Sequence, residues 1–218
     1  DAYSIDDLLR DARAYHAKMM TDVGDLRVDQ EATFHAEGAG ESGARSIMYR
    51  KGARWRTDAK MTMQGNPGMP QGGSIDAIVL FDGKDHWSVA MGMKSKLPAS
   101  AVQGQSSTPA YWVEPVAGSR VLGEETVNGR ACWLVEGPAI PAGMKLMSEP
   151  TRSWIDKRSF VLVQSEAKLS GARVLTVFSD FRKVGGHYEI PYQADVLSDG
   201  KKTMTARIVK LETGTGLS

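Results

Sequence analysis

The stretch Leu26-Arg27-Val28-Asp29-Gln30-Glu31-Ala32-Thr33-Phe34-His35-Ala36 carries the clearest structural signal in the chain. Its even-numbered positions are mostly apolar, and its odd-numbered positions carry charged or polar side chains. Successive side chains of a β-strand point to opposite faces of the sheet, so this alternation is typical of a half-buried strand. The stretch therefore predicts a strand with one side turned toward an apolar interior.

Runs of the same kind recur through most of the chain. They predict strands over residues 44–50, 53–61, 75–81, 86–91, 120–127, 130–136, 151–156, 161–169, 173–182, 188–197 and 203–211. Asp82-Gly83 and Asn128-Gly129 are dipeptides typical of type I′ hairpin turns, and Gly185-Gly186 and Asp199-Gly200 mark two further hairpins. Roughly a dozen strands joined by short turns predict an antiparallel meander.

A helix is predicted ahead of the first strand, over residues 4–20. Ser4 is a favourable N-cap, and Asp6 and Asp7 place carboxylates in the first turn, where the helix dipole favours negative charge. Apolar residues follow at steps of three and four and would form one stripe: Ile5, Leu8, Leu9, Ala12, Tyr15 and Met19. The fold class predicted from these patterns is α+β, mostly β.

The composition is that of an ordinary globular protein, and we expect a single domain over residues 1–218. Apolar residues make up 41% and charged residues 24% of the chain, so a core of this size needs no disulfide or metal. The net charge of +1 argues against nucleic acid as a partner. The sequence contains no run of 18 apolar residues, so it predicts no membrane-spanning helix. Since the chain begins at Asp1 rather than Met, we expect a mature secreted protein whose signal peptide has been removed.

Motifs for catalysis or for cofactor binding are missing from the sequence. The four histidines are scattered without the spacing of a zinc site, and no phosphate-binding or nucleophile motif stands in the required context. Asp82, Asp85 and His86 lie close together, but their position at a hairpin favours a structural role. Cys132, the single cysteine, is expected to be a buried apolar residue. We therefore predict no enzymatic activity, no cofactor and no metal.

The methionines are more informative about function than the histidines, the cysteine or the acidic residues. Seven of the 11 methionines lie in the middle of the chain: Met61, Met63, Met69, Met91, Met93, Met144 and Met147. Methionine is unbranched and adapts to varied apolar partners, so the cluster predicts a surface for a flexible apolar ligand. Ordinary core packing is the alternative for each single methionine. Three long segments, 63–74, 98–115 and 138–150, are expected to be irregular loops.

Several motifs in their order resemble those of one known family. They are YRKGARWR at 49–56, IVLFDGKDHW at 78–87, GEETVNGR at 123–130, WIDK at 154–157, FSDFRKVGG at 178–186 and TGTGLS at 213–218. This order is similar to that of the periplasmic outer-membrane lipoprotein-sorting family, the LolA/LolB-like superfamily. The resemblance covers nearly the whole chain. One departure is that Lys51 stands where the family's "K-R-P" motif has an arginine, which removes that arginine's forked hydrogen bonding.

The resemblance implies a strongly curved antiparallel sheet that forms an incomplete barrel, with helices and loops as a lid. It also implies a hydrophobic cavity for lipid acyl chains, with the helix over 4–20 and the segment 138–150 as lid candidates and Lys51 as the basic residue that controls the lid. The residues expected to line the cavity and lid are Leu8, Ala12, Met19, Trp55, Met61, Met63, Met69, Leu80, Trp87, Met91, Met93, Trp112, Met144 and Met147. Changing Met91 or Leu80 to Asp is predicted to abolish lipid uptake if those side chains face the cavity.

The function expected from these features is a periplasmic carrier or binder of lipids or lipoprotein acyl chains. The expected partners are a lipid or an acylated lipoprotein, envelope transporter or receptor proteins and, transiently, a membrane surface, and the chain is expected to be a monomer. One alternative is an envelope-sensing interaction protein that binds a regulatory partner through the same fold. Another is a binder of a small hydrophobic molecule in a different envelope pathway.

Overall fold

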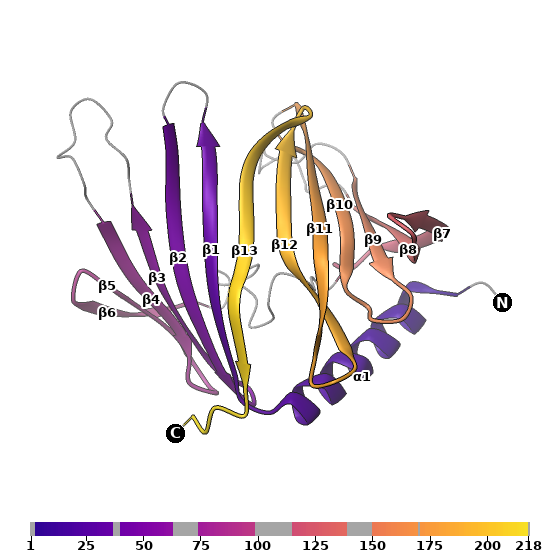
Figure 1. Ribbon diagram of the computed structural model, residues 1–218. Coiled ribbons are helices and arrows are strands. Elements are labelled where there is room, and N and C mark those ends of the chain that lie inside the picture. The colour runs from indigo at the N-terminus through magenta and orange to yellow at the C-terminus, as the bar shows by residue number, and fades with distance from the viewer. Residues whose placement is uncertain are drawn as a thin grey trace. The chain divides into compact units, whose positions relative to one another are not determined.

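The computed structural model describes residues 3–36, 40–62, 74–98, 115–138, 150–169 and 171–217. These residues form one helix and thirteen strands, which are hydrogen-bonded in the order β6-β5-β4-β3-β2-β1-β13-β12-β11-β10-β9-β8-β7 (Figure 1). Neighbouring strands are antiparallel, and β6 and β7 end the order without pairing to each other. The predicted fold class is confirmed: the protein is mostly β, with an antiparallel sheet that does not close into a barrel.

The chain divides into two compact units, which we describe separately. Unit 1 comprises Asp1–Met19 with Thr108–Thr203, and unit 2 comprises Met20–Ser107 with Met204–Ser218. The elements of unit 1 are most of α1 (Ile5–Val23), β7 (Arg120–Val127), β8 (Arg130–Gly137), β9 (Thr151–Asp156), β10 (Leu162–Leu169), β11 (Ala172–Val184) and β12 (Tyr188–Ser198). Those of unit 2 are β1 (Leu26–Ala36), β2 (Gly40–Lys51), β3 (Arg54–Thr62), β4 (Ser74–Phe81), β5 (His86–Ala90), β6 (Met93–Leu97) and most of β13 (Lys201–Thr213).

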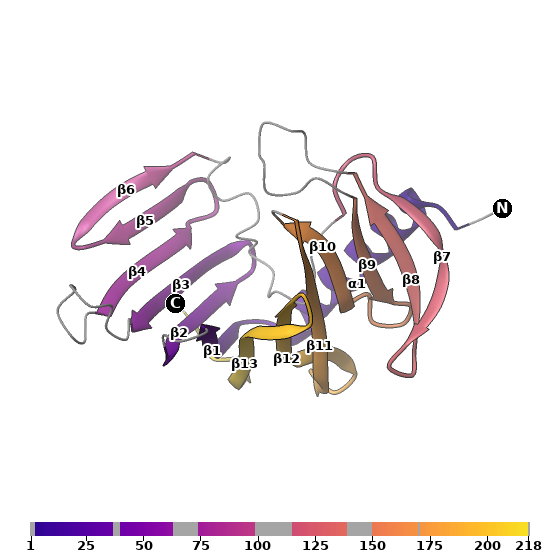
Figure 2. The ribbon, with the colours of Figure 1, turned by 90° about the horizontal axis from the view of Figure 1, so that it is seen from above.

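The strands of unit 2 lie side by side (Figure 2). β1 pairs with β2 from Leu26 opposite Arg50 to Ala36 opposite Gly40, without interruption. On its other edge β1 pairs with β13, where a bulge opposite Asp29 and Gln30 shifts the register. Because paired residues share a face of the sheet, this register decides which side chains lie together.

The helix begins with the predicted cap. Ser4 Oγ accepts a 3.1 Å hydrogen bond from the backbone N–H of Asp7, while the Asp7 carboxylate accepts one from the backbone N–H of Ser4. This reciprocal pair satisfies two backbone donors that the first turn would otherwise leave unpaired. The buried side of α1 consists of Leu8, Ala12, His16, Met19 and Val23. Three of these residues belong to the predicted stripe, whereas His16 and Val23 were not predicted to be buried.

Helix α1 lies beside the strands of unit 1 (Figure 1), and aromatic contacts hold it there. Tyr3 stacks on Trp133 of β8 with 4.2 Å between the ring centroids, and Tyr15 meets Tyr188 of β12 edge-on at 5.4 Å. A further cluster of buried residues lies within these strands, namely Cys132, Leu134, Trp154 and Val163. Each fully buried apolar side chain contributes roughly 1.5–3 kcal/mol, so this cluster stabilises unit 1.

Two differences from the predicted elements have simple causes. Strand β6, with the sequence MKSKL, was not predicted, because its lysines break the apolar pattern at an edge where both faces are exposed. Asp82-Gly83 does not form a two-residue turn. Instead, Asp82 Oδ1 accepts hydrogen bonds from the backbone N–H groups of Lys84 and Asp85 and closes a longer loop. Asn128-Gly129 and Asp199-Gly200 have the positive φ angles expected of type I′ turns.

Candidate ligand-binding face

One face of the unit 2 sheet carries mostly apolar or small side chains, and we call it the apolar face. The register from β13 to β6 assigns the residues to it. Its apolar members are Leu26, Val28, Ala32, Phe34, Ala44, Met48, Trp55, Ala59, Met61, Ala77, Val79, Phe81, Ala90, Met93, Leu97, Met204, Ala206, Ile208 and Leu211. It is the same side that the alternation in residues 26–36 predicts to be apolar, extended across six further strands.

Small side chains form a strip across this face. Ala206, Ala32 and Ala44 lie opposite one another on β13, β1 and β2. The adjacent row runs through Ser46, Ala59, Ala77 and Ala90 on β2 to β5. An alanine side chain projects only one carbon from the backbone, so this strip does not fill the space above the sheet with its own atoms. Met61 and Met93, two of the predicted methionines, flank the strip.

Large and buried residues lie at the other end of the face. Val28, Met48 and Trp55 are all less than one-tenth exposed. Beside Trp55, the ring of Phe81 stacks on His86 with 4.6 Å between centroids, and Trp55 lies 6.0 Å from the same histidine. The strip of small residues is different, since its alanines on β1 to β5 are only partly buried or exposed. The apolar face thus has one end with large, buried side chains and another end with small, more accessible side chains.

The opposite face of unit 2, which we call the charged face, carries ion pairs over β13, β1 and β2, although Ile78, Leu80, Trp87 and Val89 also lie on it over β4 and β5. Arg27 pairs with Asp29 at 2.9 Å, and Arg45 pairs with Glu31 at 2.6 Å. Lys210 pairs with Glu212 at 2.8 Å. Exposed pairs of this kind contribute little stability, but they show which side of the sheet is suited to water. The contrast between the two faces makes the apolar face the candidate binding surface.

The predicted cavity residues do not all come together. Trp55, Met61 and Met93 lie on the apolar face. Leu80 and Trp87 pair with each other on the charged face, where the Trp87 indole donates a 2.9 Å hydrogen bond to Asp82 and Lys94 lies 4.3 Å from its ring.

Met91 occupies the hairpin turn between β5 and β6 and is 90% exposed. Together with Ile78 and Val89 it lines a groove of about 590 Å³. Leu8, Ala12 and Met19 are buried on α1. Met63, Met69, Trp112, Met144 and Met147 lie outside the described residues, as do most of the three predicted loops.

Lys51, the proposed lid-control residue, contacts the C-terminal tail. Its Nζ donates a hydrogen bond to the carbonyl oxygen of Leu217. The backbone N–H of Leu217 in turn donates to Asp25 Oδ2 at 3.0 Å. These bonds fasten the tail to the same end of unit 2 as the hairpin between β2 and β3. A role of Lys51 in lid movement stays a prediction.

The chemistry of the described residues gives no sign of a reactive centre. Across the parts of the chain that the structure describes, no group of three or more His, Cys, Asp or Glu side chains is placed to hold a metal ion. Cys132 is fully buried, and burial raises the pKa of its thiol to about 11, so it stays protonated at neutral pH. No helix in the described residues is long and apolar enough to cross a membrane.

Comparison with known proteins extends these observations at the level of the fold. No protein-family model and no curated protein sequence matches the chain. A domain described as an outer membrane lipoprotein-sorting protein domain from Vibrio parahaemolyticus matches 96% of this chain and 95% of its own length, with a TM-score of 0.58 and 12% identity. A LolA-superfamily protein from Nitrosomonas europaea matches 94% and 92% of the two chains, with a TM-score of 0.55 and 12% identity.

A DUF1329 family protein from Desulfovibrio piger matches 96% of this chain and 95% of its own length, with a TM-score of 0.60 and 14% identity. All three matches span almost the full length of both chains, although their sequences have diverged widely. The protein therefore has the LolA-like fold, and the resemblance seen in the ordered motifs is confirmed at this level.

Proposed function

We propose that the protein is a non-enzymatic periplasmic carrier or binder of lipid or lipoprotein acyl chains, and that these chains lie on the apolar face of unit 2. The observation that carries the proposal is the alanine strip between methionines. An acyl chain in water costs roughly 0.8 kcal/mol per exposed CH₂, and a surface of small and flexible side chains can cover it without a fixed shape. The fold shared with lipoprotein-sorting and LolA-superfamily proteins supports the same proposal.

Neighbouring residues of β4 provide a matched pair of variants. Val79 lies on the apolar face opposite Thr57, and Leu80 lies on the charged face opposite Arg56. Both side chains are partly buried. Val79→Asp would place a carboxylate against the proposed ligand, and a charge there is strongly disfavoured. Leu80→Asp would place the same charge on the opposite face, between Arg56 and Trp87, so it is the control.

The experiment measures binding of a fluorescent fatty acid and of a synthetic triacylated lipopeptide to the purified chain. We expect the wild type and Leu80→Asp to bind both probes and Val79→Asp to bind at least about tenfold more weakly, while circular dichroism shows all three to be folded. If Val79→Asp does not fold, Ala77→Leu, which fills the strip with an apolar side chain, takes its place.

The outcomes separate the candidate functions. Binding of the lipopeptide in preference to the fatty acid would favour lipoprotein transport over a general hydrophobe binder. A wild-type chain that binds neither probe, or equal binding by the Val79 and Leu80 variants, would overturn the proposal. If the wild type binds neither probe, the envelope-sensing alternative is the candidate that remains, whereas equal binding by the two variants would mean that the acyl chains do not lie on the apolar face.

A further inference from the structure

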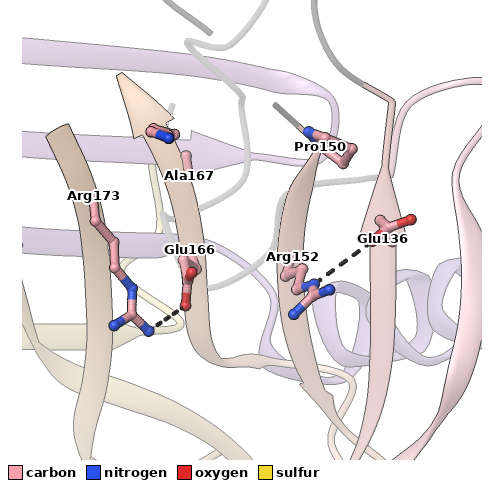
Figure 3. A pocket seen from close by; sticks show the side chains of 7 residues that line it. Glu136, Pro150, Arg152, Glu166, Ala167 and Arg173 are labelled. Atoms are coloured by element: carbon pink, nitrogen blue, oxygen red, sulfur yellow. Dashed lines mark hydrogen bonds and ion pairs between the residues drawn. The ribbon is translucent and has the colours of Figure 1, made fainter. Parts of the chain in front are cut away.

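A charged groove lies in unit 1, on strands that contribute nothing to the apolar face. Its volume is about 480 Å³ (Figure 3). The lining residues come from β8, β9, β10 and β11 and from the residue before β9: Glu136, Pro150, Arg152, Glu166, Ala167, Lys168 and Arg173. Three of them are basic and two are acidic, so the lining has a positive excess.

The sheet register creates a row of alternating charge along the groove. Arg120, Glu136, Arg152 and Glu166 stand opposite one another on four successive strands. Glu136 is already engaged by Arg120 at 2.7 Å, and this hydrogen bond lowers the pKa of the Glu136 carboxyl. Glu166 is engaged by Arg173, also at 2.7 Å. Both carboxylates are thus held by an arginine at close range.

Arg152 makes a longer ion pair than Arg120 and Arg173 do. Its guanidinium lies 3.6 Å from Glu136, which is too long for a hydrogen bond, and this is its one ion pair among the described residues. The side chain is 52% exposed and borders the groove from β9 (Figure 3). Its register partner Glu166 is bonded to Arg173 instead. The forked donors of Arg152 therefore have capacity for a further acceptor.

Arg173 borders the groove from β11, on the far side of Glu166 (Figure 3). Its Nη2 donates to Glu166, and its backbone N–H donates to Asp199 Oδ1 at 2.9 Å. Within the part of the chain that the structure describes, its Nε and Nη1 make no hydrogen bond. Two arginines with donor capacity thus face one groove, and Lys168 adds a third cation to the lining.

We propose that this groove binds a phosphate group through the remaining donors of Arg152 and Arg173, which flank the Glu166 carboxylate that Arg173 already neutralises. Planar guanidinium groups bind phosphate oxygens through paired hydrogen bonds, and such charge-assisted bonds are stronger than neutral ones. The phosphate can be free or part of a phospholipid headgroup. This site is distinct from the apolar face, and phosphate binding there does not depend on the proposed function.

The test is a calorimetric titration of the full chain with two probes at low and at physiological salt. One probe is inorganic phosphate, and the other is dihexanoyl phosphatidylglycerol below its micelle concentration. We expect saturable binding that the double variant Arg152→Gln/Arg173→Gln weakens by about tenfold. Arg152→Lys keeps the charge but loses the fork, so it should weaken binding less than the double variant does.

Arg182→Gln is the matched control, because Arg182 is a similarly exposed arginine of unit 1 that pairs with Asp180 at 2.6 Å outside the groove. It should leave binding unchanged. Binding of inorganic phosphate would identify free phosphate as sufficient. Binding of the lipid alone would identify the headgroup if the double variant weakens it, and would overturn the proposal if the double variant leaves it unchanged.

The proposal is overturned if neither probe binds saturably, or if Arg182→Gln weakens binding as much as the double variant. A chain that binds the acyl probes but no phosphate compound would refute this site alone. The converse result would refute the proposed function alone.

Discussion

His16 Nε2 donates a 3.0 Å hydrogen bond to the carbonyl oxygen of Phe160. The donor lies on the buried side of α1, and the acceptor lies in the turn between β9 and β10. This turn is itself tightly held, because Asp156 and Phe160 are joined by a backbone hydrogen bond of 2.9 Å and Phe160 has a φ of 51°. The His16 hydrogen bond thus links the helix to the connection between β9 and β10, and Tyr15 of the same helix packs on the Phe160 ring at 5.6 Å between centroids.

This link predicts that the protein loses stability as the pH falls below about 6.5. Burial lowers the pKa of His16 from its ordinary value of 6.5, and the hydrogen bond to Phe160 offsets only part of that effect. Between the unfolded and the folded pKa, the unfolded chain binds a proton that the folded chain does not, so stability falls as the pH falls. One such group changes the free energy of unfolding by at most about 1.4 kcal/mol per pH unit.

Urea denaturation at a series of pH values between 7.5 and 5 measures this effect. His16→Gln keeps a side-chain donor and should remove much of the slope, whereas His86→Gln in unit 2 should retain it. Asp156 affects the stability of the protein in a different, more acidic pH range. Burial raises its pKa, but hydrogen bonds from Ser159 and Arg158 lower it overall, so its contribution is lost only below about pH 4. An unchanged slope in His16→Gln would contradict the prediction.

Met91→Asn is predicted to stabilise the protein by about 0.5–1 kcal/mol. Met91 and Gly92 form the two-residue turn between β5 and β6, with φ angles of 52° and 76°. A left-handed conformation is unfavourable for methionine and acceptable for asparagine. The Met91 side chain is 90% exposed, so the substitution removes almost no packing.

Thermal denaturation of the variant should show a higher melting temperature. Met93→Asn is the control two residues later, at an exposed position in an extended strand, where asparagine is disfavoured. It should leave stability unchanged or lower it. A lower melting temperature for Met91→Asn would show that Met91 makes contacts that stabilise the turn.

The fold could be predicted from the sequence largely because its signals are local. The alternation over residues 26–36 and the Asn128-Gly129 turn each determine their own structure, and both are found as predicted. Strand β6 was missed because an edge strand needs no apolar face. The helix predicted over residues 4–20 shows the same principle: it is found over Ile5–Val23, ending three residues later than predicted and just before Gly24, whose φ is positive.

The candidate site was harder to predict because its residues come together through register. Leu80 and Trp87 are as apolar as Val79 and Phe81, but a displacement of one position puts them on the charged face. The alanine strip was missed for a different reason. Ala32, Ala44, Ala59 and Ala77 are inconspicuous one by one, and only the paired strands show that they form one surface.

Glu125→Leu is predicted to destabilise the protein by about 1–2 kcal/mol, because it leaves a donor unpaired. The indole Nε1 of Trp154, which is 7% exposed, donates a 2.7 Å hydrogen bond to Glu125 Oε2. Glu125→Gln retains an acceptor and should cost less. The adjacent Glu124 is the control: it points to the other face of β7 and makes a partly exposed pair with Lys157 at 2.7 Å.

Because exposed ion pairs contribute at most about 1 kcal/mol, Glu124→Leu should change stability little. Urea denaturation followed by tryptophan fluorescence measures all three variants, and the free energy of unfolding should fall in the order Glu124→Leu, Glu125→Gln, Glu125→Leu. If Glu124→Leu proves as costly as Glu125→Leu, the hydrogen bond to Trp154 cannot be what makes Glu125 important, and the charge on β7 itself would be the stabilising feature.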